Sequence, residues 1–226
     1  MECDYELLKS KLIGLPAGIE LAIGSNNLTD NLLYFLIWAK DQGFFCNVTI
    51  NQGHLLRDQE KIKYCIDRKL IKGLGVSYRS SLKWNVPQFI LDYPNTVFHV
   101  IMGIDDINNI LSLKEKGVKK VLTLGEKDFG FNLNKVDLTT LKHKQWFWWV
   151  NKLYDNFDVV SFDNLALQQL KLKRFFRDKE WGIFNQNEHS FYLNAVEGYL
   201  SPSSRDNKKI NWNDIHLKQF YKEHLQ

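Results

Sequence analysis

Short runs of apolar residues alternate along this chain with longer segments in which apolar residues recur every three or four positions. The short runs are rich in Val, Ile and Leu and recur about every 25 to 30 residues, which is the spacing of strand–helix–strand crossovers. Runs without polar alternation are typical of strands that are covered on both faces, so we expect a parallel α/β sheet or barrel. The predicted strands are residues 19–23, 44–50, 73–77, 96–102, 119–124 and 158–161.

Amphipathic segments between these strands predict the crossover helices. Gly43 and Gly117 end two of them, as glycine commonly does after a last helical turn. The long connection 127–140 follows a strand end, where such connections are often functional. The predicted helices are residues 4–14, 27–43, 58–69, 86–92, 105–116, 139–154, 164–172 and 213–224, and a hairpin is predicted from 191–193 and 195–200.

The chain is long enough for one sizeable core. With 226 residues and 44% hydrophobic residues, we expect a single domain overall. Residues 1–175 would form a partial (β/α) barrel, and residues 176–226 a C-terminal extension packed on it. The aromatic run 146–149 then fits packing against the barrel exterior better than a base-stacking platform.

Charge and cysteine content narrow the class of protein. The net charge of +4 is spread along the chain, and clusters such as 171–174 fit solvated surfaces, so we do not expect nucleic acid as a partner. Cys3, Cys46 and Cys65 are too few and too irregular for a disulfide framework or zinc site. The first residues lack the pattern of a signal peptide, and no apolar run is long enough to span a bilayer. We therefore expect a soluble cytoplasmic protein without a membrane partner.

Polar residues stand where each predicted strand ends. In parallel α/β architectures the carboxyl ends of strands share one edge, and ligands bind there. Nucleotide-loop, zinc-protease and nucleophile-elbow motifs are absent, so no local motif names the chemistry. The candidate ligand residues are Gly24, Ser25, Asn26, Asn27, Asn51, Gln52, Ser77 and His99, and the candidate substrate-binding residues are Lys127, Asp128, Asp163 and Arg205.

Each candidate also has a structural interpretation. The stretch 24–27 fits a turn with a helix N-cap, and Asn51 and Gln52 fit a turn. His99 lies in an apolar strand, where a lone histidine more often has a structural hydrogen bond than a catalytic role. Asp163 fits a helix cap as well as a substrate contact, and Arg205 fits a solvated loop. These alternatives stay open at this point.

The strand ends carry a family resemblance. The segments "AKDQGF", "NVTIN" and "GLGVSY", with the strand ends 24–27, 49–52 and 75–77, resemble the core of radical S-adenosylmethionine (radical SAM) enzymes. Residues 95–130 are similar to the fifth and sixth units of phage and bacterial members, and the resemblance covers roughly residues 5–205. It implies an incomplete parallel (β/α) barrel in which residues at the strand ends bind S-adenosylmethionine.

The cluster motif of that family is missing. Its [4Fe-4S] cluster is held by Cys-x3-Cys-x2-Cys, and no such triplet occurs here. Cys46 and Cys65 are expected to be buried structural thiols. The resemblance thus implies that the first strand and the cluster loop are absent as a block. It also implies that a separate or missing N-terminal segment supplies the cluster. A second chain that completes the barrel could be this segment.

Three functional hypotheses follow. In the first, this chain supplies the S-adenosylmethionine and substrate walls of a radical SAM enzyme acting on a small molecule or peptide. In the second, a degenerate barrel binds a nucleotide or partner without radical chemistry. In the third, an unrelated barrel enzyme uses His99, Lys127 and Asp163 in acid–base chemistry.

Overall fold

A computed structural model describes residues 3–25, 27–79, 85–101, 105–125, 140–175, 177–179, 181, 190–204 and 206–224. The chain divides into two compact units. One contains Met1–Leu21, Thr29–Cys46 and Gly182–Gln226, and the other contains Ala22–Leu28 and Asn47–Trp181. No helix within the described ranges is long and apolar enough to cross a membrane.

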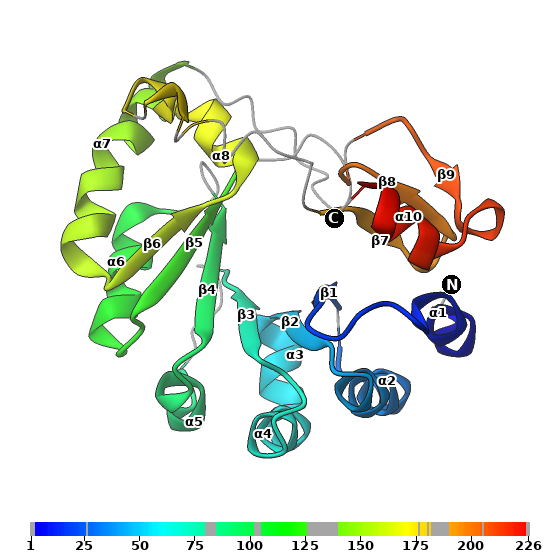
Figure 1. Cartoon of the computed structure of the whole chain (residues 1–226). Coiled ribbons are helices and arrows are strands. Elements are labelled where there is room, and N and C mark those ends of the chain that lie inside the picture. Colours follow the sequence, from blue (N-terminus) through cyan, green and yellow to red (C-terminus); the bar gives the residue numbers. More distant parts are fainter. Residues whose placement is uncertain are drawn as a thin grey trace. The chain divides into compact units, whose positions relative to one another are not determined.

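Six strands form one parallel sheet in chain order (Figure 1). Each strand therefore pairs with its neighbours in sequence, as expected of consecutive crossover units. The sheet is open, because β1 and β6 lie at its two ends and do not pair with each other. The strands are β1 (Glu20–Gly24), β2 (Phe45–Asn51), β3 (Gly73–Ser77), β4 (Thr96–Ile101), β5 (Lys120–Leu124) and β6 (Val159–Phe162).

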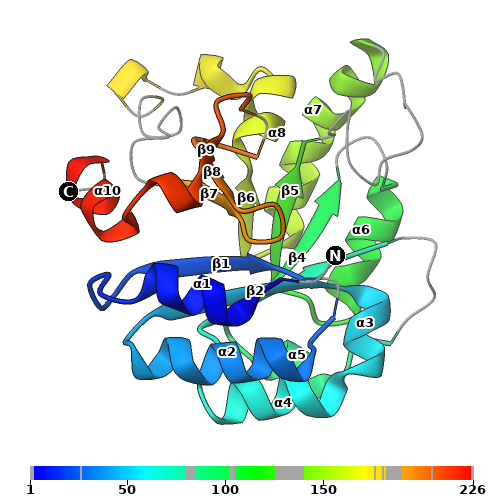
Figure 2. The ribbon, with the colours of Figure 1, turned by 90° about the vertical axis from the view of Figure 1, so that its right-hand side faces the viewer.

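Helices separate these strands along the chain. Four of them, α4 to α7, lie along one face of the sheet (Figure 1, Figure 2). The helices are α1 (Tyr5–Leu12), α2 (Asp30–Asp41), α3 (Gln52–Arg57), α4 (Gln59–Asp67), α5 (Gln88–Asp92), α6 (Ile107–Glu115), α7 (Thr140–Asn156) and α8 (Asn164–Gln169), followed by the 3₁₀ turn η1 (Leu172–Phe175).

The two faces of the sheet differ in chemistry. In β2, β4 and β5 every second residue is buried, and these buried residues are mostly apolar. Removing this apolar surface from water is the main force that holds the helices on the sheet. The intervening residues are only half-buried and include polar side chains. The buried set is Val48, Ile50, Leu74, Val76, Phe98, Val100, Val121 and Thr123.

Helix ends follow the expected capping chemistry. Thr29 Oγ1 accepts a hydrogen bond from Leu32 N at 3.2 Å and so caps α2. At the end of α4, Lys69 adopts a left-handed conformation with φ of 53°, and Leu70 N donates to Cys65 O at 2.8 Å. This is a Schellman motif with lysine in the position that glycine usually takes.

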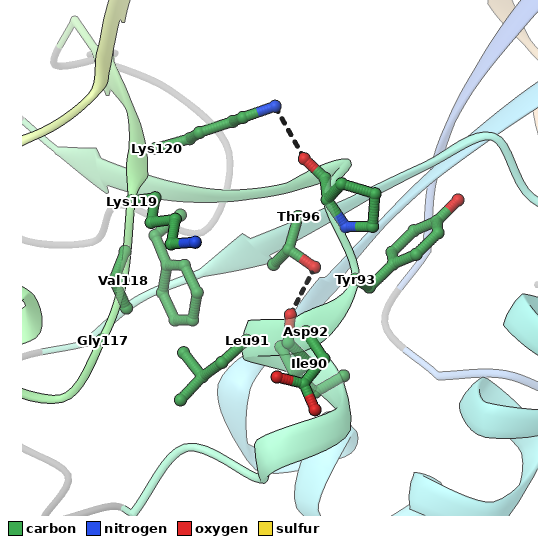
Figure 3. Close-up of a pocket in the computed structure, with 11 residues that line it drawn as sticks. Ile90, Leu91, Asp92, Tyr93, Thr96, Gly117, Val118, Lys119 and Lys120 are labelled. Carbon is green, nitrogen blue, oxygen red and sulfur yellow. Dashed lines mark hydrogen bonds between the residues drawn. The ribbon is translucent and has the colours of Figure 1, made fainter.

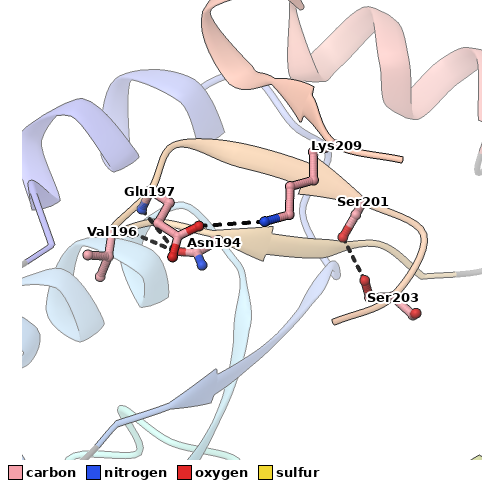
Figure 4. A network of polar contacts seen from close by, with 6 residues as sticks. All are labelled: Asn194, Val196, Glu197, Ser201, Ser203 and Lys209. Carbon is pink, nitrogen blue, oxygen red and sulfur yellow. Dashed lines mark hydrogen bonds and ion pairs between the residues drawn. The ribbon is translucent and has the colours of Figure 1, made fainter. Parts of the chain in front are cut away.

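The other unit contains a three-stranded antiparallel sheet, β7 (Tyr192–Asn194), β8 (Tyr199–Ser201) and β9 (Ile210–Asn211), and then η2 (Trp212–Asp214) and α10 (Leu217–His224). Asn194 Oδ1 accepts from the backbone N–H groups of Val196 and Glu197 and so shapes the β7–β8 turn (Figure 4). Gly198 has φ of 71°, and a Cβ there would lie 2.6 Å from Trp212 Nε1. Glycine is therefore required at this turn.

The parallel α/β sheet is confirmed, and it is open. The predicted helix 58–69 is confirmed as α4, and the short helix α3 that precedes it was not predicted. The hairpin prediction misplaced its second strand, since residues 195–198 form the turn and β9 adds a third strand. Trp148 of the aromatic run is 68% exposed, contrary to the expected packing, and the side chains of residues 146 and 147 are outside the described part of the chain.

Candidate functional site

One face of the sheet carries a row of polar side chains near the carboxyl ends of its strands; Asn51, Ser77 and His99 are half-buried, and Ser161 is exposed. The register pairs Asn51 with Ser77, Ser77 with His99, His99 with Leu122, and Leu122 with Ser161. We call Asn51, Ser77, His99 and Ser161 the polar row. Within the described part of the chain, the side chains of Ser77, His99 and Ser161 have no hydrogen-bond partner. Their hydrogen-bonding atoms remain available to a ligand.

Gly75 makes room for the ring of His99. A Cβ at Gly75 would lie 2.7 Å from His99 Cε1, 2.9 Å from Nε2 and 2.5 Å from Thr49 Oγ1. The His99 ring therefore lies across β3, on the same face as Thr49. Glycine in a strand commonly marks such a close approach.

His99 is held in its neutral form near physiological pH. Burial lowers the pKa of His99 below its ordinary value of 6.5, and the Asp163 carboxylate partly opposes this effect. A neutral imidazole has one donor and one acceptor nitrogen, so His99 can bind an uncharged polar group.

Asp163 joins two strand ends to a helix. Its Oδ1 accepts hydrogen bonds from Gly125 N at 2.9 Å and from Ala166 N at 2.7 Å. Asp163 thereby caps α8 and ties the end of β5 to the end of β6. The structural interpretation of Asp163 is confirmed, and its charge also acts on His99.

The first predicted loop makes its own turn. Ser25 Oγ donates to Asn27 O at 2.7 Å, and Ser25 N donates to Thr49 O at 3.0 Å. Thr29, and not Asn27, provides the N-cap of α2. Gly24 faces open space, because a Cβ there would meet no atom within 4 Å. The predicted approach of a ligand to Gly24 is therefore sterically allowed.

Asn51 and Gln52 are engaged within the protein. Asn51 Oδ1 caps α3 by accepting from His54 N at 2.9 Å, while Asn51 Nδ2 lies 2.9 Å from His54 Nδ1. Gln52 is 1% exposed, and its Oε1 accepts from Arg79 N at 2.9 Å. The turn predicted at these residues is wrong, because Asn51 caps helix α3, which begins at Gln52; His54, which contacts Asn51, was not among the predicted site residues.

Four predicted residues lie outside the described ranges. They are Asn26, Lys127, Asp128 and Arg205. The predicted ligand-binding role of Asn26 and the predicted substrate-binding roles of the other three residues stay predictions.

The cysteines do not form a cluster site. Cys46 lies on the helix-covered face of β2 and is 2% exposed, and Cys65 is buried in α4. Burial raises the pKa of Cys46 to about 12 and that of Cys65 to about 11, which disfavours the thiolate form that binds metal. Cys3 lies in α1's N-terminal flank, and the described residues contain no group of three metal-ligating side chains. The buried-thiol prediction is confirmed, and the residues present do not fit an iron–sulfur cluster.

A hollow of about 350 Å³ lies at the opposite, amino edge of the sheet, beside α5 (Figure 3). Two of its polar groups are already used, since Thr96 Oγ1 donates to Ile90 O and Lys120 Nζ donates to Pro94 O. Parallel sheets bind ligands at the carboxyl edge, so the polar row is the better candidate despite this hollow. Comparisons with protein families, curated proteins and solved structures found no match to this chain.

Proposed function

We propose that this chain supplies the S-adenosylmethionine-binding and substrate-binding walls of a radical SAM-type enzyme whose [4Fe-4S] cluster is carried by residues outside this chain. The observation that supports it is the polar row on one face of an open parallel sheet whose strands follow chain order. A ligand on this face would meet hydroxyl groups and a neutral imidazole, which suit a ribose, an adenine edge or an amino-acid group.

The residues of the polar row offer different kinds of hydrogen bond to a ligand. Ser77 and Ser161 offer hydroxyl groups that donate and accept, and His99 offers one nitrogen of each kind. Gly24 and Gly75 leave space for backbone approach and for the His99 ring. When bound, the cluster would supply the electron that cleaves S-adenosylmethionine; this chain's residues bind and orient the ligand.

Calorimetry with S-adenosylmethionine tests this proposal. We expect the purified chain to bind it, and His99→Ala and Ser77→Ala each to weaken binding by about 3- to 10-fold, the effect of one lost hydrogen bond. Ser10→Ala is the control, because Ser10 bonds only to Leu7 O in its own helix, α1. No binding by the wild-type chain would refute the proposal, and iron–sulfur absorbance after anaerobic reconstitution of this chain alone would contradict the placement of the cluster.

A second candidate is a binding module without radical chemistry. The cysteines favour it, because Cys46 and Cys65 are buried and the described residues contain no group of three metal-ligating side chains. Adding a cluster-loaded polypeptide that carries Cys-x3-Cys-x2-Cys to this chain and S-adenosylmethionine distinguishes the enzyme from the binding module. Release of 5'-deoxyadenosine would favour the enzyme, and binding without cleavage would favour the module.

A further inference from the structure

One side-chain amide at the carboxyl end of β2 makes two contacts with a single residue. Asn51 Oδ1 accepts from His54 N, and Asn51 Nδ2 lies 2.9 Å from His54 Nδ1. The two contacts use opposite ends of the amide. If the amide turned over, Nδ2 would face the His54 backbone N–H, and the cap of α3 would be lost. The orientation of the amide is therefore fixed by the helix cap.

The fixed amide determines where the neutral His54 ring carries its proton. Asn51 Nδ2 only donates, so His54 Nδ1 must accept, and the proton must reside on Nε2. Within the described residues, Nε2 of this half-buried ring makes no hydrogen bond. His54 thus presents one N–H donor without a partner.

His54 lies at the edge of the sheet where the polar row lies. Only Gln52 and Gly53 separate it from Asn51, whose register partner is Ser77. The donor of His54 and the hydroxyl of Ser77 therefore come from two neighbouring strand ends. An acceptor atom of a bound ligand would complete this arrangement.

We propose that His54 is a ligand-binding residue that donates a hydrogen bond from Nε2 to an oxygen of the ligand, and that Asn51 is its positioning residue. This inference rests on the proposed function and adds a specific contact to it. The oxygen belongs to the carboxylate or to the ribose of S-adenosylmethionine. Separate titrations with methionine and adenosine distinguish these two sources.

The proton position is measured first, without ligand. Nitrogen-15 NMR of the wild-type chain should show His54 as the Nε2–H tautomer. Asn51→Asp retains a good N-cap, but its carboxylate oxygens can only accept a hydrogen bond from His54 Nδ1. At alkaline pH the ring proton of His54 should therefore move from Nε2 to Nδ1. An Nδ1–H tautomer in the wild-type chain would overturn the inference.

Binding is measured next with a matched pair of variants. His54→Gln keeps an N–H donor near the place of Nε2, and we expect its affinity for S-adenosylmethionine to stay within about threefold of wild type. His54→Asn keeps an amide near Nδ1 but is too short to replace Nε2, so we expect about 3- to 10-fold weaker binding. Equal thermal stability of the two variants shows that the difference does not arise from unfolding.

The outcomes separate the two proposals. Wild-type binding with His54→Asn unaffected would overturn the role of His54 and leave the proposed function in place. Absence of wild-type binding would overturn the proposed function and, with it, the contact made by His54. Weaker binding by His54→Asn, together with binding by His54→Gln close to that of wild type, supports both the proposed function and the role of His54.

Discussion

Gly75→Ala is the substitution that most directly tests the geometry of the site. The new Cβ would lie 2.5 Å from Thr49 Oγ1 and 2.7 Å from His99 Cε1, about 1 Å closer than favourable contacts between heavy atoms. Both neighbours are side chains, so they must turn away from β3. Overpacking of this kind costs about 1–3 kcal/mol. For a chain of this length we expect Tm to fall by about 2–12 °C.

The displaced ring gives a second measurement. Burial lowers the pKa of His99, so a ring forced toward solvent should titrate closer to the ordinary value of 6.5. NMR of the His99 Cε1–H signal across pH measures this change, and calorimetry measures the accompanying loss of S-adenosylmethionine binding. For Tm and the His99 titration, Gly24→Ala is the matched control, because its Cβ would meet nothing within 4 Å.

The reasoning would be refuted if Gly75→Ala melted at the same temperature as Gly24→Ala and left the titration of His99 unchanged. That result would mean that the His99 ring does not lie over β3. A drop in Tm without a change in the His99 titration would place the steric conflict on Thr49 alone.

Three further predictions concern stability. As pH is lowered, His99 takes up a proton near pH 6.5 in the unfolded chain, but only at lower pH in the folded chain. The free energy of unfolding should therefore decrease as pH falls below about 6.5. Urea titrations should show a weaker pH dependence for His99→Gln than for wild type. Thr123→Val should raise the free energy of unfolding by about 1–3 kcal/mol in denaturant melts, because Thr123 Oγ1 is buried without a partner within the described residues. Lys69→Gly should raise it by about 1 kcal/mol by relieving the left-handed backbone, and an unchanged or lower midpoint would contradict this account of the cap.

Local sequence patterns were sufficient to predict most of the sheet. Strand β3 was predicted at its observed bounds, and glycines after α2 and α6 marked helix ends correctly. These features depend on residues close together in the chain. Helix α3 was missed because it has only 6 residues and is capped by a side chain of the preceding strand.

The chemistry at the strand ends was harder to predict. Asn27 follows β1 and Asn51 ends β2, yet only Asn51 caps a helix, because Thr29 takes that role after β1. The contact of Gly75 with Thr49 and His99 depends on register between strands more than 20 residues apart. Sequence analysis identified His99 but had no signal for Thr49. For His54 the only signal was its position three residues after an Asn that ends a strand.

The order of the strands has a consequence for biosynthesis. Because β1 to β6 pair in the order in which they are made, each strand emerging from the ribosome finds its partner already present, and the sheet can grow in one direction during translation. The other unit differs, since it joins Met1–Leu21 and Thr29–Cys46 to Gly182–Gln226. Its last segment is synthesised only after β1 to β6, so the polar row can be complete before all residues of that unit have been made.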